Sequence, residues 1–324
     1  MIKDNSRPSI LEANFFYLFI GIILLLLGSY VQRKEIYSGL LITEFIIILI
    51  PTIFYLKMRG YSLKEVLRLN KISIKQALLI PLIVIFSYPI GTFFNYLMLI
   101  VLNYFGKISP NPVPIPENSQ EMIIGLIVIA LSAGICEEVM FRGFVMKAYE
   151  KRGMKLSIIC SAILFGMFHF NIQNLLGPIY LGLIFGYIVH KTGSIFSSII
   201  AHTANNAFAL VLGMLVTKIS IDPEMAADAA VSGAISDTTA MLIGGIGIGF
   251  VAVICGIIVF FLLKLLPGVE DKKSENMYSN IQIDTIIYEG EGIERSTKEG
   301  IASYIPIFLV LLIFIYVTYL SFKM

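Results

Sequence analysis

The stretch ALSAGICEEVMFRGF, residues 130–144, decides the fold class because it places ionisable side chains inside a long apolar segment. Between Glu121 and Lys147, the charged residues are Glu137, Glu138 and Arg142 alone. A helix needs about 20 apolar residues to cross a bilayer, and charged residues within such a helix usually face a protein interior or a water-filled cavity. The stretch therefore predicts a membrane-spanning helix that carries a buried polar site.

Charge-free runs elsewhere extend this prediction to further spans. The 324-residue chain is 57% hydrophobic and 14% charged, whereas soluble domains carry roughly 25% charged residues. We predict an all-α fold, a polytopic transmembrane helical bundle of about eight or nine spans. The expected spans are residues 12–31, 39–56, 77–103, 121–146, 156–170, 175–190, 194–217, 240–265 and 301–322.

Lysine and arginine residues concentrate in two predicted loops, which follow the second and the fourth span. Because basic loops face the cytoplasm, we expect an integral protein of the plasma membrane with a cytoplasmic N-terminus, although Arg33 and Lys34 conflict with this orientation. Ser62 and Glu65 form a capping-box pattern, which favours a short surface helix as strongly as a plain linker. The basic residues are Lys57, Arg59, Lys64, Arg68, Lys71 and Lys75, then Lys147, Lys151, Arg152 and Lys155.

Charge and cysteine usage narrow the function classes. The net charge is +2 and the basic residues are spread among short loops, so we expect no nucleic-acid partner. Cys136, Cys160 and Cys255 all fall inside predicted spans. We expect them to be packing residues rather than disulfide partners.

The two glutamates of the fourth span, Glu137 and Glu138, are expected to point in different directions. Glu138 and Arg142 are four residues apart, on one helix face, so the arginine can neutralise that carboxylate. Glu137 points roughly 100° away. We predict that Glu138 has a structural role and that Glu137 is free for chemistry.

Two of the three histidines lie inside apolar spans. His169 stands four residues after Phe165, and His202 stands four before Asn206, with Asn205 on nearly the same face. His190 lies at a span end and receives no role. Glu44, in the second span, has no partner that the sequence identifies.

Other interpretations compete with an enzyme. A buried ion-pair network that fixes helix packing would use the same glutamates and arginine, and each histidine alone is commonly a hydrogen-bonded packing residue. A transporter or channel would use Glu137, His169 and His202 as a proton or ion relay. A non-enzymatic membrane protein that confers immunity or assists assembly is the other alternative.

Three short motifs resemble those of the CAAX protease and bacteriocin-processing family, which includes the type II CAAX prenyl endopeptidases. The family pattern EExxxR is present as EEVMFR at 137–142, FxxxH as FGMFH at 165–169, and HxxxN as HTANN at 202–206. The resemblance covers about residues 121–212.

The resemblance implies an intramembrane endopeptidase that acts on a membrane-associated or lipidated peptide or protein. Glu137 and His169 would activate water, and His202 and Asn206 would stabilise the oxyanion. Glu138, Arg142, Phe165 and Asn205 would support them. Zinc held by Glu137, His169 and His202 is one option, and a glutamate mechanism without metal is the other. We expect the cavity to open on the cytoplasmic side, where the basic loops lie.

These considerations divide the chain into four parts. Residues 1–75 form a two-span hairpin with a basic cytoplasmic loop, and 76–266 form the protease bundle. Residues 267–300 form a polar cytoplasmic segment, and 301–324 the last span.

Overall fold

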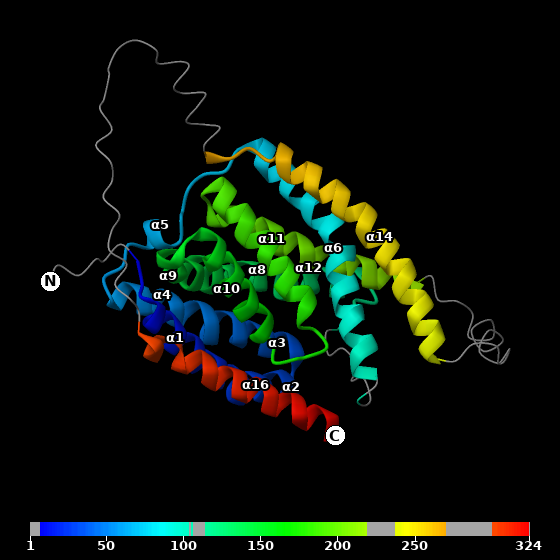
Figure 1. The fold of residues 1–324 in the computed structure, drawn as a ribbon, viewed down its shortest axis with the longest axis horizontal. Helices are drawn as coiled ribbons and strands as arrows, with labels where there is room; N and C mark the ends of the chain where they lie inside the picture. Colours follow the sequence, from blue (N-terminus) through cyan, green and yellow to red (C-terminus); the bar gives the residue numbers. More distant parts are fainter. Residues whose placement is uncertain (1–6, 104, 106–113, 219–236, 270–299, 324) are drawn as a thin grey trace, which may run out of the picture.

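Helices account for all the regular structure in the described part of the computed structural model, which comprises residues 7–103, 105, 114–218, 237–269 and 300–323. The predicted all-helical, polytopic bundle is confirmed (Figure 1). Seven stretches are long and apolar enough to cross a membrane, namely Ile10–Lys34, Ile36–Met58, Ile74–Asn103, Ser119–Arg152, Ile195–Lys218, Met241–Leu265 and Ile301–Lys323.

The other two predicted spans are helical but shorter. Helix α10 covers Met154–Met167, 14 residues, and α11 covers Leu176–Thr192, 17 residues. At 1.5 Å per residue, α10 extends only about 21 Å. The chain therefore turns within the bundle after α10, and the residues of that turn are candidates for lining a cavity.

Several long helices contain π-helical turns, which widen the backbone and rotate the side chains that follow. The second span consists of α3 (Ile36–Leu41), π-helix η2 (Ile42–Leu49) and α4 (Ile50–Met58). The fourth consists of α7 (Ser119–Gly125), η3 (Leu126–Leu131), α8 (Ser132–Glu138), η4 (Val139–Val145), α9 (Met146–Tyr149) and the 3-10 turn Glu150–Arg152. Both acidic spans thus contain irregular turns at their carboxylates.

The first helical stretch, α1 (Ile10–Ile23), η1 (Leu24–Gly28) and α2 (Ser29–Lys34), packs directly on the helices that carry the motifs. Tyr17 donates a hydrogen bond to the carbonyl of Leu164 at 2.7 Å. Its ring also contacts Phe141 and Phe168. The N-terminal hairpin is therefore part of the same core as the motif helices.

The remaining helices complete the bundle. Helix α6 (Ile74–Asn103) packs along α14 (Asp237–Leu265), and α12 (Ile195–Lys218) packs against α6 and α8 (Figure 1). The last helix, α16 (Ile305–Lys323), follows the short turn η6 (Ile301–Tyr304) and lies against α1. Most of the predicted polar segment, 270–299, lies outside the described residues.

Small residues let the helices approach closely, as expected at membrane helix interfaces. A Cβ atom on Gly182 would lie 2.9 Å from the Cα of Ala162, so α11 touches the backbone of α10. A Cβ on Gly134 would lie 2.2 Å from Oγ1 of Thr203, on α12. The three cysteines are free, as predicted.

The first basic loop contains a short helix, α5 (Leu63–Val66), capped by Ser62, which decides between the helix and the plain linker that the sequence favoured equally. Arg68 forms an ion pair with Glu150 and donates to the carbonyl of Arg142 at 3.1 Å. Burial lowers the pKa of Arg68 to about 10. This loop therefore fixes the end of the fourth span.

Candidate active site

Glu138, Arg142 and His202 form a sealed polar cluster between α8, η4 and α12. Nη1 of Arg142 lies 2.7 Å from Oε1 of Glu138, and Nδ1 of His202 donates to the same oxygen at 2.9 Å. The side chains of Glu138 and Arg142 are 0% exposed. The predicted pairing of Glu138 with Arg142 is confirmed, and His202 is its third member.

Aromatic rings enclose this cluster. The guanidinium of Arg142 stands 4.5 Å from the ring centre of Phe165 and 5.3 Å from that of Phe185. His202 stacks on Phe185 with 5.4 Å between ring centroids. Such cation–π contacts help to compensate a desolvated cation. The cluster is consequently closed to solvent and joins the fourth span to α10, α11 and α12.

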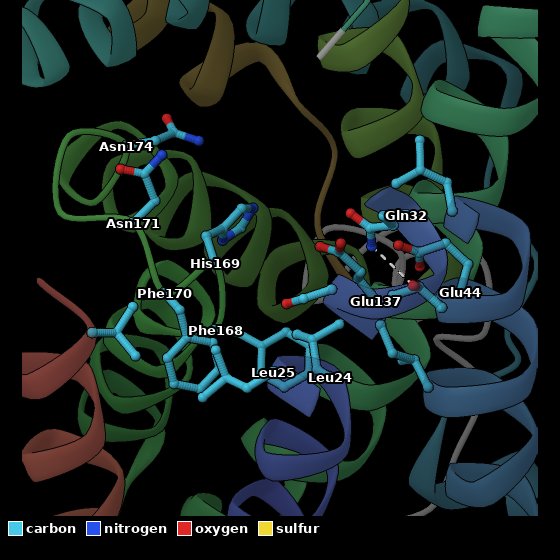
Figure 2. A pocket seen from close by; sticks show the side chains of 15 residues that line it. Leu24, Leu25, Gln32, Glu44, Glu137, Phe168, His169, Phe170, Asn171 and Asn174 are labelled. Carbon is cyan, nitrogen blue, oxygen red and sulfur yellow. Dashed lines mark hydrogen bonds between the residues drawn. The ribbon is translucent and has the colours of Figure 1, made fainter. Parts of the chain in front are cut away.

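Glu137 faces the other way, into a cavity of about 370 Å³. Figure 2 shows its carboxylate directed into this space together with the ring of His169. Oε2 of Glu137 is buried and has no hydrogen-bond partner in the described part of the chain. The helical rotation that separates neighbouring glutamates thus places one in the sealed cluster and one on the cavity wall.

His169 is positioned by the turn that ends α10. Its Nδ1 lies 3.1 Å from the carbonyl oxygen of Phe165. Because a carbonyl can only accept, Nδ1 must carry the proton, and Nε2 of the neutral ring is left as an acceptor. The next residue, Phe170, has a φ of 46°, which is a strained conformation for a bulky side chain. The turn therefore presents a basic nitrogen to the cavity.

Asn205, Asn206 and His202 lie off the cavity wall. Asn205 donates to Oδ1 of Asn206 at 3.0 Å, and Asn206 donates to the carbonyl of Ile129 at 3.2 Å. The ring of Phe165 makes edge contacts with His169 at 5.4 Å and with His202 at 5.6 Å between centroids. Phe165 therefore contacts both histidines, and among the predicted residues Glu137 and His169 line the cavity whereas His202 and Asn206 do not.

The donor atoms do not fit a three-ligand zinc site as they are placed. In both His169 and His202 a hydrogen bond occupies Nδ1, which would leave Nε2 to bind a metal. No group of three histidine, cysteine or acidic side chains in the described chain is spaced to hold an ion, however. No step proposed below involves a metal.

The cavity is also lined by polar residues for which the sequence analysis predicted no role. Glu44 is 5% exposed and lies beside Glu137 in Figure 2. Asn171 and Asn174 line the wall near His169. Glu44 was noticeable in the sequence because carboxylates are rare within spans. Its neighbour, Glu137, is identified only by the packing of η2 against α8.

The cavity lies at the end of the bundle opposite the basic loops. Helix α1 begins beside Arg59, which pairs with Glu12, and runs away from that end. Helix α10 likewise starts next to the second basic loop and ends before His169. The cavity residues Leu24, Leu25, Ser29, Gln32, Asn171 and Asn174 come from the far ends of these elements. The expectation of a cavity on the side of the basic loops is therefore wrong.

A helical bundle of membrane-spanning length with a carboxylate and a histidine on one cavity provides the two groups that a membrane hydrolase would use to activate water. The family described as type II CAAX prenyl endopeptidase Rce1-like matches residues 119–208, which include all three motifs. A protein of Bacillus subtilis (strain 168) named "Putative membrane peptidase YdiL" is 29% identical over 108 residues, or 33% of this chain and 44% of that relative. No solved structure matches.

These similarities confirm the resemblance drawn from the motifs. The matches support membership of the CAAX protease and bacteriocin-processing family for residues 119–208, and the matched relative is named a membrane peptidase. The match covers less than half the length of the curated relative.

Proposed function

We propose that the protein is an intramembrane endopeptidase in which Glu137 and His169 activate a water molecule. The observation that carries this proposal is that the unpartnered Oε2 of Glu137 and the acceptor nitrogen of His169 lie on one cavity. Both groups can accept a hydrogen bond from the same water. A carboxylate within hydrogen-bond reach of the water is a group that can act as a general base.

The reaction would proceed by general base and general acid catalysis. The water oxygen forms a bond with the carbonyl carbon of the substrate while Glu137 takes the proton. The C–N bond then breaks, and Glu137 returns that proton to the leaving amine. His169 would orient the water and hold its second hydrogen atom.

The oxyanion role of His202 and Asn206 remains part of the proposal. His202 and Asn206 do not line the cavity that holds Glu137 and His169, so this role requires the side chains around them to move when the substrate binds. Catalytic hydrogen bonds commonly tighten only in the complex with substrate. One oxyanion donor is typically worth on the order of a hundredfold in rate.

We also propose an orientation in the plasma membrane with the basic loops and the N-terminus in the cytoplasm. The cavity, at the opposite end, would then open toward the extracytoplasmic side. A membrane-associated segment on that side, such as a leader of a secreted peptide, could reach it directly. A prenylated tail held at the cytoplasmic face would have to cross most of the bundle.

The test is a comparison of membranes that contain the wild-type protein, Glu137→Gln or the control Glu65→Gln, whose site is exposed on α5. We expect peptide products with the wild type and the control, and none with Glu137→Gln. Products that persist with correctly folded Glu137→Gln would contradict the proposal. Loss of activity on chelation, restored by zinc, would instead support the metal-dependent alternative with Glu137, His169 and His202 as ligands.

A further inference from the structure

The cavity wall next to Glu137 is formed by a part of the chain outside the matched family segment. Glu44 lies in η2, far from residues 119–208 in the sequence, and its side chain is directed into the cavity (Figure 2). Among the described residues that line the cavity, the charged ones are Glu44 and Glu137, and there is no lysine or arginine. The lining is therefore acidic.

The Glu44 carboxylate is buried, and the described part of the protein supplies no cation or hydrogen-bond donor to its Oε2. Glu44 is 5% exposed, and its Oε2 has no hydrogen-bond partner in the described part of the chain. The polar neighbours are engaged elsewhere, because Gln32 donates to Oγ1 of Thr43 at 2.9 Å and Thr43 donates to the carbonyl of Gly39 at 2.8 Å. Buried carboxylates normally have a cationic or hydrogen-bonding partner. This one lacks a partner on the side that faces the empty space.

A cation from a bound molecule would complete the site. A lysine, an arginine or an α-amino group would place positive charge between the Glu44 carboxylate and the cavity, where low solvent access strengthens the attraction. A cavity of about 370 Å³ has room for such a side chain beside a peptide backbone. A terminal carboxylate at the same place would be repelled by both glutamates.

We propose that Glu44 is a specificity residue that binds a cationic group of the substrate next to the scissile bond. This rests on the proposed peptidase function. Glu137 keeps its role as base, and Glu44 selects peptides that carry a basic side chain or a free amino group at the position beside it. The N-terminal hairpin would thus determine which peptides the family residues cleave.

The test uses purified full-length protein in detergent and a mixture of peptides that vary at every position, with products identified by mass spectrometry. Matched peptides then carry Lys, Gln or Glu at the selected position, each with a free or an acetylated N-terminus. For the wild type we expect kcat/KM to be about tenfold or more higher for the cationic peptide than for the neutral one. If acetylation alone removes the preference, the cation is the α-amino group, and if only Lys→Gln removes it, the cation is the side chain.

Two variants locate the recognition. Glu44→Gln should lose the preference and still cleave neutral peptides, and Glu44→Lys should favour the Glu peptide, whereas Glu65→Gln should behave as the wild type. Thermal unfolding of each variant shows whether it is folded. Cleavage by the wild type without charge preference, or a preference that survives in Glu44→Gln, would refute the role of Glu44 and leave the peptidase proposal intact. Absence of any cleavage by folded wild type would overturn both.

Discussion

Removing the charge of Glu138 or Arg142 should show how much the sealed cluster contributes to the free energy of unfolding. In Glu138→Gln the guanidinium of Arg142, which is 0% exposed, loses its counter-charge. Breaking a fully buried pair in this way typically costs 3–5 kcal/mol, roughly. Contacts with Phe165 and Phe185 continue to stabilise the cation, so we expect the lower end, about 3 kcal/mol in the free energy of unfolding. Arg142→Met should cost about the same, because it leaves the Glu138 carboxylate buried beside His202 alone.

The double variant distinguishes a coupled pair from two independent contributions. With both charges removed, no uncompensated buried charge remains, and we expect a total loss smaller than either single loss and far below the additive value of roughly 6 kcal/mol. The assay is unfolding in detergent micelles, followed by circular dichroism as denaturant is added, with Glu65→Gln as the control. Additive losses, or single losses below about 1 kcal/mol, would refute the view that this cluster is a closed electrostatic unit.

Two further changes test the packing around the site. Gly134→Ala should lower the free energy of unfolding by about 1–3 kcal/mol, because its Cβ would overlap Thr203 on α12. The control Gly247→Ala should be neutral or slightly stabilising, because no atom lies within 4 Å of the added Cβ. Equal effects of the two substitutions would contradict close packing of α8 on α12. Arg68→Gln should lower the free energy of unfolding by about 1–3 kcal/mol, since Glu150 loses one of its two cationic partners and keeps Lys147 at 3.2 Å. Exposed Lys64→Gln should change it by less than about 0.5 kcal/mol. Similar melting temperatures for both variants would show that the basic loop is not anchored through Arg68.

The helical spans were predictable because the bilayer imposes a simple constraint on sequence. Long apolar runs such as 76–106 have few alternatives to a spanning helix. The shortness of α10 was not predictable from hydropathy, because residues after Met167 remain apolar or neutral while the backbone turns. The π-helical turns that flank the acidic pair leave no recognisable pattern in the residues, since they depend on how neighbouring helices pack.

Those features of the site were predictable for which the helical period alone decides where a side chain points. The i, i+4 spacing gave the Glu138–Arg142 pair, and the 100° rotation gave the separate face of Glu137. Which helix meets which face depends on tertiary packing, so the bond from His202 to Glu138 and the contacts of Phe165 with both histidines were not predicted. The position of the cavity was likewise not predictable from the sequence. The end of the bundle at which it lies depends on where α1 and α10 end.

Two parts of the chain line the cavity, the segment that matches the family and the N-terminal hairpin. This arrangement would allow one set of proposed catalytic residues to serve different substrates. Glu137 and His169 come from the segment that matches the family, whereas Gln32 and Glu44 come from the N-terminal hairpin. Reactive groups on rigid, packed helices keep their geometry, and a separate wall can change its charge without disturbing them. In this protein that wall carries a carboxylate, so its contribution to specificity is electrostatic. Exchange of the hairpin between relatives should therefore transfer substrate preference while the catalytic pair stays the same.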